Sequence, residues 1–221
     1  MRWWAFPFIH LYLSLLSTMG SIMSKPKIAI IGRGHVANAI QQGAERAGYE
    51  VRTTGHDAKD VSLAASWGDV LILAVPGPAR RATVQELGDV RGKVLVDPTN
   101  LLSPDYSSYT GDPSKSGAEE LQEWAAGARV VKAFNTVFAV HMSTGKIQGE
   151  PISLFVAADD PEAKAQVLRL GKDIGFHAVD AGPLRNARML EPLGVLNIQL
   201  SRGPSHYGPG IGFRLIGAPS K

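Results

Sequence analysis

The 221-residue sequence contains no cysteine, and this absence excludes several kinds of chemistry at once. Disulfide bonds, thiol nucleophiles and thiolate zinc sites all require that side chain. The six histidines are dispersed along the chain, and no two have the spacing of a metal-binding pair on one helix. We therefore expect no metal site and no covalent thiol catalysis.

The sequence also lacks a large excess of either positive or negative charge. The net charge is +3, and no long run of lysine or arginine occurs. Proteins that bind nucleic acids usually carry such a basic patch, so we expect no nucleic-acid partner. Hydrophobic residues make up 44% and charged residues 19% of the chain, which is typical of a folded globular domain.

Long hydrophobic runs are absent apart from the amino terminus. There, one basic residue precedes a mostly apolar stretch that ends in small residues, an order typical of a signal peptide. A proline, a histidine and a serine interrupt the stretch, so we expect no stable membrane span. Translation that begins at Met19 or Met23 and a membrane-surface anchor are the alternatives. We therefore treat residues 1–22 as an amino-terminal extension outside the fold, and expect a cytoplasmic protein.

The rest of the chain alternates between short apolar runs and amphipathic segments. Strands are expected at 27–31, 50–54, 70–75, 93–96 and 129–134, and helices at 35–48, 61–67, 80–87 and 117–126. Ser116 and Glu119 have the spacing of a capping box for the last of these helices. This alternation predicts an α/β fold with a Rossmann doubly wound parallel sheet.

After about residue 140 the same rhythm continues over a shorter stretch. Strands are expected at 152–157 and 177–180, and helices at 161–174 and 185–202. We therefore predict two units: a first domain at 25–140 and a small carboxy-terminal α/β extension at 141–221. No flexible linker separates them, so we expect the second unit to pack on the first and close a cleft.

One motif lies between the first predicted strand and the first predicted helix. It is Gly32, Arg33, Gly34, His35, Val36 and Ala37, a G-x-G-x-x-A pattern. In this context the first glycine permits a tight turn and the second lets the backbone approach a pyrophosphate. The small third residue lets helix and strand pack closely, and the helix amino terminus holds the phosphates. The first domain is therefore predicted to bind a dinucleotide.

The second predicted strand lacks the acidic residue that NAD-binding proteins usually have at its end. The sequence there is Thr54, Gly55 and His56, and Asp57 follows only in the turn. Thr54 and His56 can donate hydrogen bonds to a 2′-phosphate, which a carboxylate would repel. We therefore expect NADP rather than NAD. A solvated turn pair of His56 and Asp57, with loose cofactor choice, is the alternative.

Two other strand ends point to the same place. Ala74, Val75 and Pro76 end the third predicted strand, and Asn100 follows the fourth. Ligands of open parallel sheets lie beyond the carboxyl ends of the strands. We expect Pro76 to shape a loop beside the cofactor and Asn100 to reach its ribose or nicotinamide. A loop-capping role is the alternative for Asn100.

Three later segments resemble a known family. They are Lys132-Ala133-Phe134-Asn135-Thr136, the run DAGPLRNAR at 180–188, and Leu190-Glu191-Pro192-Leu193. They resemble the NADPH-dependent reductases of the deazaflavin coenzyme F420, and they are similar to the oxidoreductase domain of STEAP-type metalloreductases. The resemblance spans most of the chain beyond the amino-terminal extension.

The resemblance implies an NADP-dependent oxidoreductase. It would transfer a hydride between the nicotinamide and coenzyme F420, FMN or FAD as second substrate, with the protein positioning the two rings. The run from Arg33 to Val36 would then lie along the pyrophosphate, and Ala139 and Ile211 would lie near the nicotinamide and the acceptor. The family typically has Ser-Arg where this chain has Gly55 and His56, so NADP affinity is expected to be weaker or pH-dependent.

Other interpretations of the sequence stay open. One is an NADP-binding sensor or interaction module without turnover, and another is a different NADP-dependent dehydrogenase, of the imine or β-hydroxyacid type. We predict no catalytic side chain. Glu191 is expected to cap a helix or form a salt bridge, with Arg188 as a candidate partner. A homodimer is an open alternative to a monomer.

Overall fold

The computed structural model describes residues 25–204 and 206–217, so the predicted extension at 1–22 lies outside the described residues. The main sheet contains β1 (Ile28–Ile31), β2 (Val51–Thr54), β3 (Val70–Leu73), β4 (Val94–Asp97), β5 (Arg129–Lys132), β8 (Ser153–Ala158) and β9 (His177–Asp180). A hairpin contains β6 (Lys146–Ile147) and β7 (Glu150–Pro151). The α-helices are α2 (His35–Arg46), α3 (Ala58–Trp67), α4 (Arg80–Glu86), α5 (Gly117–Trp124), α6 (Ala139–Met142), α7 (Pro161–Ile174) and α8 (Ala187–Arg202).

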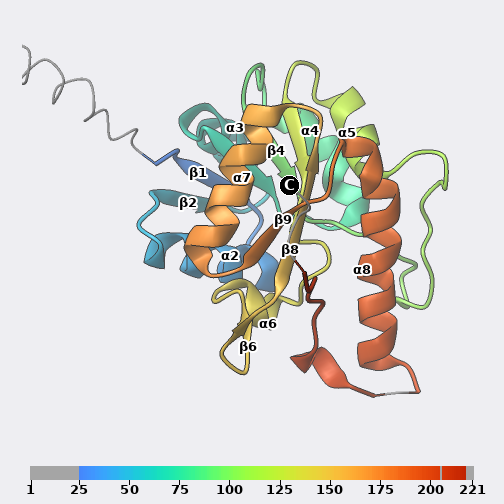
Figure 1. Cartoon of the computed structure of the whole chain (residues 1–221). Helices are drawn as coiled ribbons and strands as arrows, with labels where there is room; N and C mark the ends of the chain where they lie inside the picture. The colour runs from blue at the N-terminus through green and yellow to red at the C-terminus, as the bar shows by residue number, and fades with distance from the viewer. Residues whose placement is uncertain (1–24, 205, 218–221) are drawn as a thin grey trace, which may run out of the picture.

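The seven strands of the main sheet have the order β2-β1-β3-β4-β5-β8-β9, and β1 to β5 are parallel (Figure 1). The predicted doubly wound Rossmann fold is therefore confirmed. The chain passes from β1 to β2 on one side and then to β3 on the other side of β1. Open α/β sheets bind ligands at such a switch point, beyond the carboxyl ends of the strands.

Two apolar layers cover the sheet, one on each face. Ile28 and Ile30 belong to the layer that contains α2 and α7, whereas Ala29 and Ile31 belong to the layer that contains α3, α4 and α5. Successive side chains of a strand point to opposite faces. Because both faces are covered, the strand is apolar at every position, as expected for a buried parallel sheet.

The predicted carboxy-terminal unit adds two strands to this same sheet. β8 pairs with β5 in antiparallel orientation, with Val131 opposite Ala158, and β9 pairs with β8 in parallel. The short helix α6 and the hairpin β6–β7 were not predicted. Elements of two to four residues are too short to show a periodic pattern. The boundary between two units at residue 140 stays a prediction.

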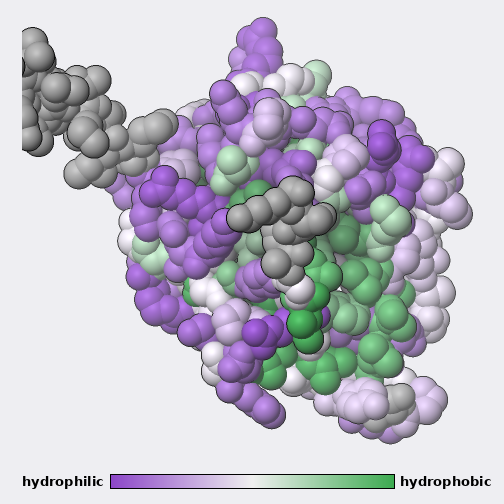
Figure 2. All heavy atoms as spheres, viewed as in Figure 1, coloured by the Kyte–Doolittle hydropathy of each residue, from purple (hydrophilic) through white to green (hydrophobic). Residues whose placement is uncertain are grey.

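Helix α8 stands at the side of the molecule and is only partly covered (Figure 1). Leu190 is buried in it, but Met189 and Leu196 are 64% and 49% exposed. Figure 2 shows hydrophobic side chains gathered between α8 and the carboxy-terminal segment. The predicted homodimer stays a prediction. Over residues 25–204 and 206–217, no helix has the length and apolar character that crossing a bilayer requires.

Candidate functional site at the switch point

Gly32 joins the ends of three strands. Its N–H donates a hydrogen bond of 2.9 Å to the Thr54 carbonyl at the end of β2. Its φ is +127°, and a Cβ added to it would lie 2.1 Å from the carbonyl oxygen of Ala74, just after β3. No other residue fits here without displacing the backbone. The structure thus brings together three of the predicted segments, at 32–37, 54–56 and 74–76.

Gly34 has a different environment. Its φ is −78°, and a Cβ added to it would meet nothing within 4 Å. The fold therefore does not require a glycine here, and the backbone faces open space. Gly34 is also the N-cap of α2 and provides no side-chain hydrogen bond to the first turn of that helix. An open helix amino terminus with exposed backbone is suited to a phosphate group.

The next residues of the motif begin α2. His35 is exposed and Val36 is partly buried, whereas Ala37 is fully buried in the layer between α2 and the sheet. A larger side chain at Ala37 would push the helix away from the strands. The small third residue of the motif therefore has the packing role that the sequence predicts.

The segment after β2 contains the most informative arrangement. A Cβ on Gly55 would lie 3.7 Å from Nε and 3.8 Å from Cζ of Arg33, so the Arg33 guanidinium lies beside Gly55. The Asp57 carboxylate accepts hydrogen bonds from the Lys59 and Asp60 N–H groups, at 3.1 Å and 3.2 Å, and so caps α3. The first carboxylate after β2 is therefore directed toward its own helix.

Thr54, the last residue of β2, contributes a buried polar atom at this strand end. The residue is 5% exposed, and within the described chain its Oγ1 has no hydrogen-bond partner. Buried hydroxyl groups nearly always have a partner, so this atom suits a ligand that accepts or donates a hydrogen bond there. His56 is exposed and lies directly after Gly55.

The remaining predicted residues lie in two places. After β3, Val75 and Pro76 lead into a 3-10 turn, η1 (Gly77–Ala79), and Pro76 is exposed. Asn100 instead pairs with Asn135: its Nδ2 donates to the Asn135 carbonyl at 2.7 Å, and its Oδ1 accepts from Asn135 Nδ2 at 2.9 Å. Both ends of the Asn100 amide are therefore used within the protein, as in the loop-capping alternative.

Ala139 and Ile211 belong to segments that meet. Ala139 is the first residue of α6, and Ile211 follows a second 3-10 turn, η3 (Gly208–Gly210). His141 Nε2 lies 2.9 Å from the carbonyl oxygen of Pro209, which links the two segments. Both Ala139 and Ile211 are partly exposed. Their proximity to a nicotinamide stays a prediction.

A buried ionic cluster lies at the ends of β4 and β5. It consists of Arg80, Asp97, Lys132 and Glu191, each at most 1% exposed. Lys132 Nζ lies 3.0 Å from Asp97 Oδ2 and 2.9 Å from Glu191 Oε1, and Arg80 lies 3.8 Å from Asp97. Burial raises the pKa of Asp97, but the charges of Lys132 and Arg80 outweigh it and hold that pKa below its usual range.

Glu191 connects α8 to the rest of the molecule. Its carboxylate accepts from the N–H groups of Gly117 at 3.1 Å and Ala118 at 3.3 Å, which begin α5, and from the Tyr109 hydroxyl at 3.1 Å. The predicted capping and salt-bridge role is thus observed, but with Lys132 as the ion partner. Arg188 instead pairs with Glu119 at 2.6 Å. Two motifs of the family resemblance therefore meet in a structural cluster.

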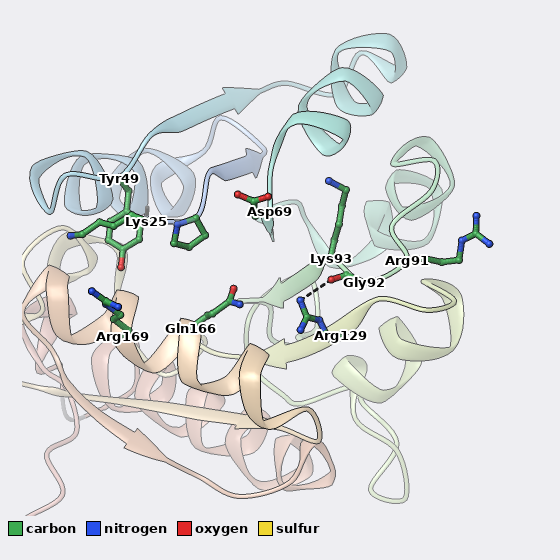
Figure 3. A pocket seen from close by; sticks show the side chains of 10 residues that line it. Lys25, Tyr49, Asp69, Arg91, Gly92, Lys93, Arg129, Gln166 and Arg169 are labelled. Carbon is green, nitrogen blue, oxygen red and sulfur yellow. Dashed lines mark hydrogen bonds between the residues drawn. The ribbon is translucent and has the colours of Figure 1, made fainter. Parts of the chain in front are cut away.

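A hollow of about 540 Å³ lies at the opposite edge of the sheet (Figure 3). Its lining comes from residues at or just before the starts of the strands, including Lys25, Tyr49, Asp69, Lys93 and Arg129, and from helix α7. Three of its cations already donate to main-chain carbonyls: Lys25 to Ala47, Lys93 to Gly68 and Arg129 to Gly92. Cations at helix carboxyl ends stabilise those ends. None of the predicted site residues lines this hollow, and parallel sheets bind ligands at the other edge.

Comparison with known proteins shows which reductases the chain resembles. Residues 27–101, which include the glycine loop at 32–37, match the model of a family described as "NADP oxidoreductase coenzyme F420-dependent". The predicted resemblance is confirmed. The chain is 31% identical over 150 residues to the F420-dependent NADP reductase of Methanothermobacter thermautotrophicus, covering 62% of each protein.

Two further proteins extend the comparison. The chain is 25% identical to the metalloreductase STEAP3 of Rattus norvegicus, over 76% of this chain and 36% of that protein. The crystal structure of a putative F420-dependent NADP-reductase from Arthrobacter sp. FB24 superposes with a TM-score of 0.78 at 26% identity, covering 86% of this chain and 99% of the other. The chain spans between about one third and just under two thirds of the curated relatives it matches.

The sequence did not reveal two features of this corner. The position of Arg33 along a pyrophosphate stays a prediction, and the structure adds that its guanidinium lies beside Gly55. The sequence placed Asp57 in the turn after the strand, with a solvated pair of His56 and Asp57 as the alternative, and did not predict that Asp57 caps α3. The spacing of Asp57 and Asp60 before an amphipathic segment was the available signal for that cap.

Proposed function

We propose that this protein is an NADP(H)-dependent oxidoreductase that transfers a hydride between the nicotinamide and a flavin-like ring such as coenzyme F420 or a flavin. The observation that carries the proposal is the open backbone at Gly34 at the switch point of the sheet, where no Cβ contact requires a glycine. A glycine that the fold does not need, at a helix amino terminus, is accounted for by close approach of a pyrophosphate.

The residues of this corner fit NADP(H). The first turn of α2 provides free N–H groups, Thr54 Oγ1 has no partner among the described residues, and the Asp57 carboxylate is engaged in capping α3. With the Asp57 carboxylate directed at its own helix, the described residues offer no carboxylate at the end of β2 that would accept from both ribose hydroxyls. The names of the related reductases support the same cofactor.

The hydride chemistry belongs to the two ring systems when they are bound, and the protein orients them. Pro76 follows β3 at this edge of the sheet, and the segments that contain Ala139 and Ile211 meet each other. In this proposal the three residues border the nicotinamide and the acceptor. The charged groups of the ionic cluster are buried and paired, and they connect α5 to α8. This arrangement needs no nucleophilic or acid–base side chain.

The test uses the full chain with NADPH and, in separate reactions, coenzyme F420, FMN and FAD. We expect NADPH oxidation, followed by absorbance, with at least one of these acceptors. Gly34→Val should abolish NADPH binding in calorimetry and leave the unfolding temperature unchanged, because its side chain enters open space. Asn38→Ala, one turn further along α2 and exposed, is the matched control and should bind normally.

Unchanged NADPH affinity in a folded Gly34→Val protein would contradict the site. Tight NADPH binding without turnover of any acceptor would instead support the alternative of a binding module.

A further inference from the structure

The Arg33 guanidinium lies beside Gly55, the residue directly after β2. Nε, Cζ and Cδ of Arg33 lie 3.7, 3.8 and 3.9 Å from the position of a Cβ on Gly55. A Cβ at these distances makes ordinary van der Waals contact, so a side chain at Gly55 would lie directly against the guanidinium. Arg33 and Gly55 are therefore a neighbouring pair.

The charge of Arg33 is not neutralised by the described residues around it. No salt bridge within 4.0 Å and no hydrogen bond of its guanidinium is found in the described part of the chain, and the residue is exposed. The first acidic residue after β2, Asp57, is engaged with the N–H groups of α3. An arginine held at a strand end without a carboxylate partner is prepared for an anion from outside.

We propose that Arg33, from the glycine loop, binds the 2′-phosphate of NADP(H) and sets the preference for NADP over NAD. The proposal rests on the proposed function, because the adenosine ribose must lie at the end of β2. In doubly wound folds this strand end selects between the two cofactors. Thr54, the last residue of β2, adds a neutral hydrogen-bonding group at the same strand end, since its Oγ1 is buried and has no partner within the described residues.

This role alters the expectation drawn from Gly55 and His56. The sequence implied that the loss of a second-strand arginine weakens NADP binding or makes it pH-dependent. A guanidinium stays charged at all physiological pH values, whereas an imidazole loses its charge above neutral pH. With Arg33 as the main phosphate ligand, the preference for NADPH persists at about pH 8.5, where an imidazole is neutral.

The experiment measures the dissociation constants of NADPH and NADH for the full chain by fluorescence titration at pH 7 and 8.5. Arg33→Ala should weaken NADPH binding about 10- to 100-fold, the range for charge-assisted hydrogen bonds, and leave NADH binding within about twofold. Arg33→Lys should retain part of the preference, because it keeps the charge and loses the planar fork. Arg52→Ala is the matched control: Arg52 is an exposed cation on β2 that stacks on Trp67 at 4.3 Å, and its loss should not alter the ratio.

A second variant tests the pair from the other side. Gly55→Glu places a carboxylate against Arg33, so it should reverse the preference toward NADH while the protein still binds dinucleotides. Equal losses of NADPH and NADH affinity in Arg33→Ala would place Arg33 on the pyrophosphate and overturn the inference, as would unchanged affinities. If the unmodified chain binds neither dinucleotide, the proposed function itself fails, which is a separate outcome.

Discussion

The glycine loop and the ionic cluster both lie at the carboxyl ends of strands of the same sheet, but their charged side chains differ in burial and pairing. In the loop, Arg33 is exposed, and the carboxylate of nearby Asp57, after β2, is directed toward α3. In the cluster, Lys132 and Glu191 are completely buried and lie 2.9 Å apart. A charge that binds a ligand must stay accessible, whereas a buried charge is tolerated only with a partner.

The comparison separates two kinds of residue that share one edge of the sheet. Variants of Arg33 and Gly34 should alter binding and leave stability unchanged, whereas variants in the cluster should alter stability first. The family resemblance draws on both regions, so resemblance alone does not distinguish them. Each prediction below is directed at that difference.

The largest effect is expected in the cluster. Lys132→Met leaves Glu191 buried without its ion partner and Asp97 with Arg80 alone, so the free energy of unfolding should fall by about 3–5 kcal/mol. Unfolding in urea measures it. The control is Arg91→Ala, which removes an ion pair with Asp89 whose side chains are 79% and 61% exposed, and should leave the midpoint unchanged. Equal midpoints for both variants would contradict a stabilising role for the cluster.

The next effect distinguishes the two glycines of the motif. Gly32→Ala forces a side chain into the Ala74 carbonyl at a φ of +127°, and should cost about 1–3 kcal/mol or more. Gly34→Ala has no such contact and should leave the free energy of unfolding within about 0.5 kcal/mol. Urea denaturation of the two variants side by side checks this. Comparable destabilisation in both would mean that Gly34 is also structural.

A smaller effect is expected at Asp57. Asp57→Ala removes the cap of α3 and should lower stability by about 1 kcal/mol, whereas Asp57→Asn keeps a capping side chain and should cost less. Neither should weaken NADH binding in a fluorescence titration. A clear loss of NADH affinity in Asp57→Asn would show that this carboxylate contacts the ribose. The site would then use an anionic side chain as well as the cation of Arg33.

The smallest effect is expected at the partly exposed pair beside α5. The hydrogen bond from Arg188, together with those from Ser116, lowers the pKa of Glu119 from 4.5 to about 2. A lowered pKa stabilises the fold above pH 4.5, and that stabilisation is lost as the pH falls from 4.5 toward 2. Arg188→Ala should therefore lose less stability over this interval than the unmodified protein. Urea midpoints at pH 6, 4 and 3 test it, and parallel curves would contradict it.

Much of the fold could be predicted because the pattern is strong. The bounds of α7 and β9 match the prediction, and the capping box of Ser116 and Glu119 is present. Buried parallel strands are apolar at every position, and the helices between them show one apolar face. The direction of β8 was not predictable, because strand patterns do not distinguish parallel from antiparallel pairing.

The candidate site was predictable where backbone geometry decides it and not where side chains do. The glycine loop is recognisable because a turn between strand and helix needs specific small residues. The Arg33 guanidinium lies beside Gly55, more than twenty residues later along the chain, and only packing brings the two together. The pairing of Asn100 with Asn135 likewise depends on how α8 packs over both, since a Cβ on Gly194 would lie 2.6 Å from Asn100 Oδ1.

By itself, the sequence determined the doubly wound sheet, the location of the glycine loop after β1 and the absence of a carboxylate at the end of β2. These follow from local periodicity and from turn residues, which act over a few positions. Only the tertiary structure decided which charges are free and which are paired. The partners of Lys132 are 35 and 59 residues away along the chain, and only packing brings them together.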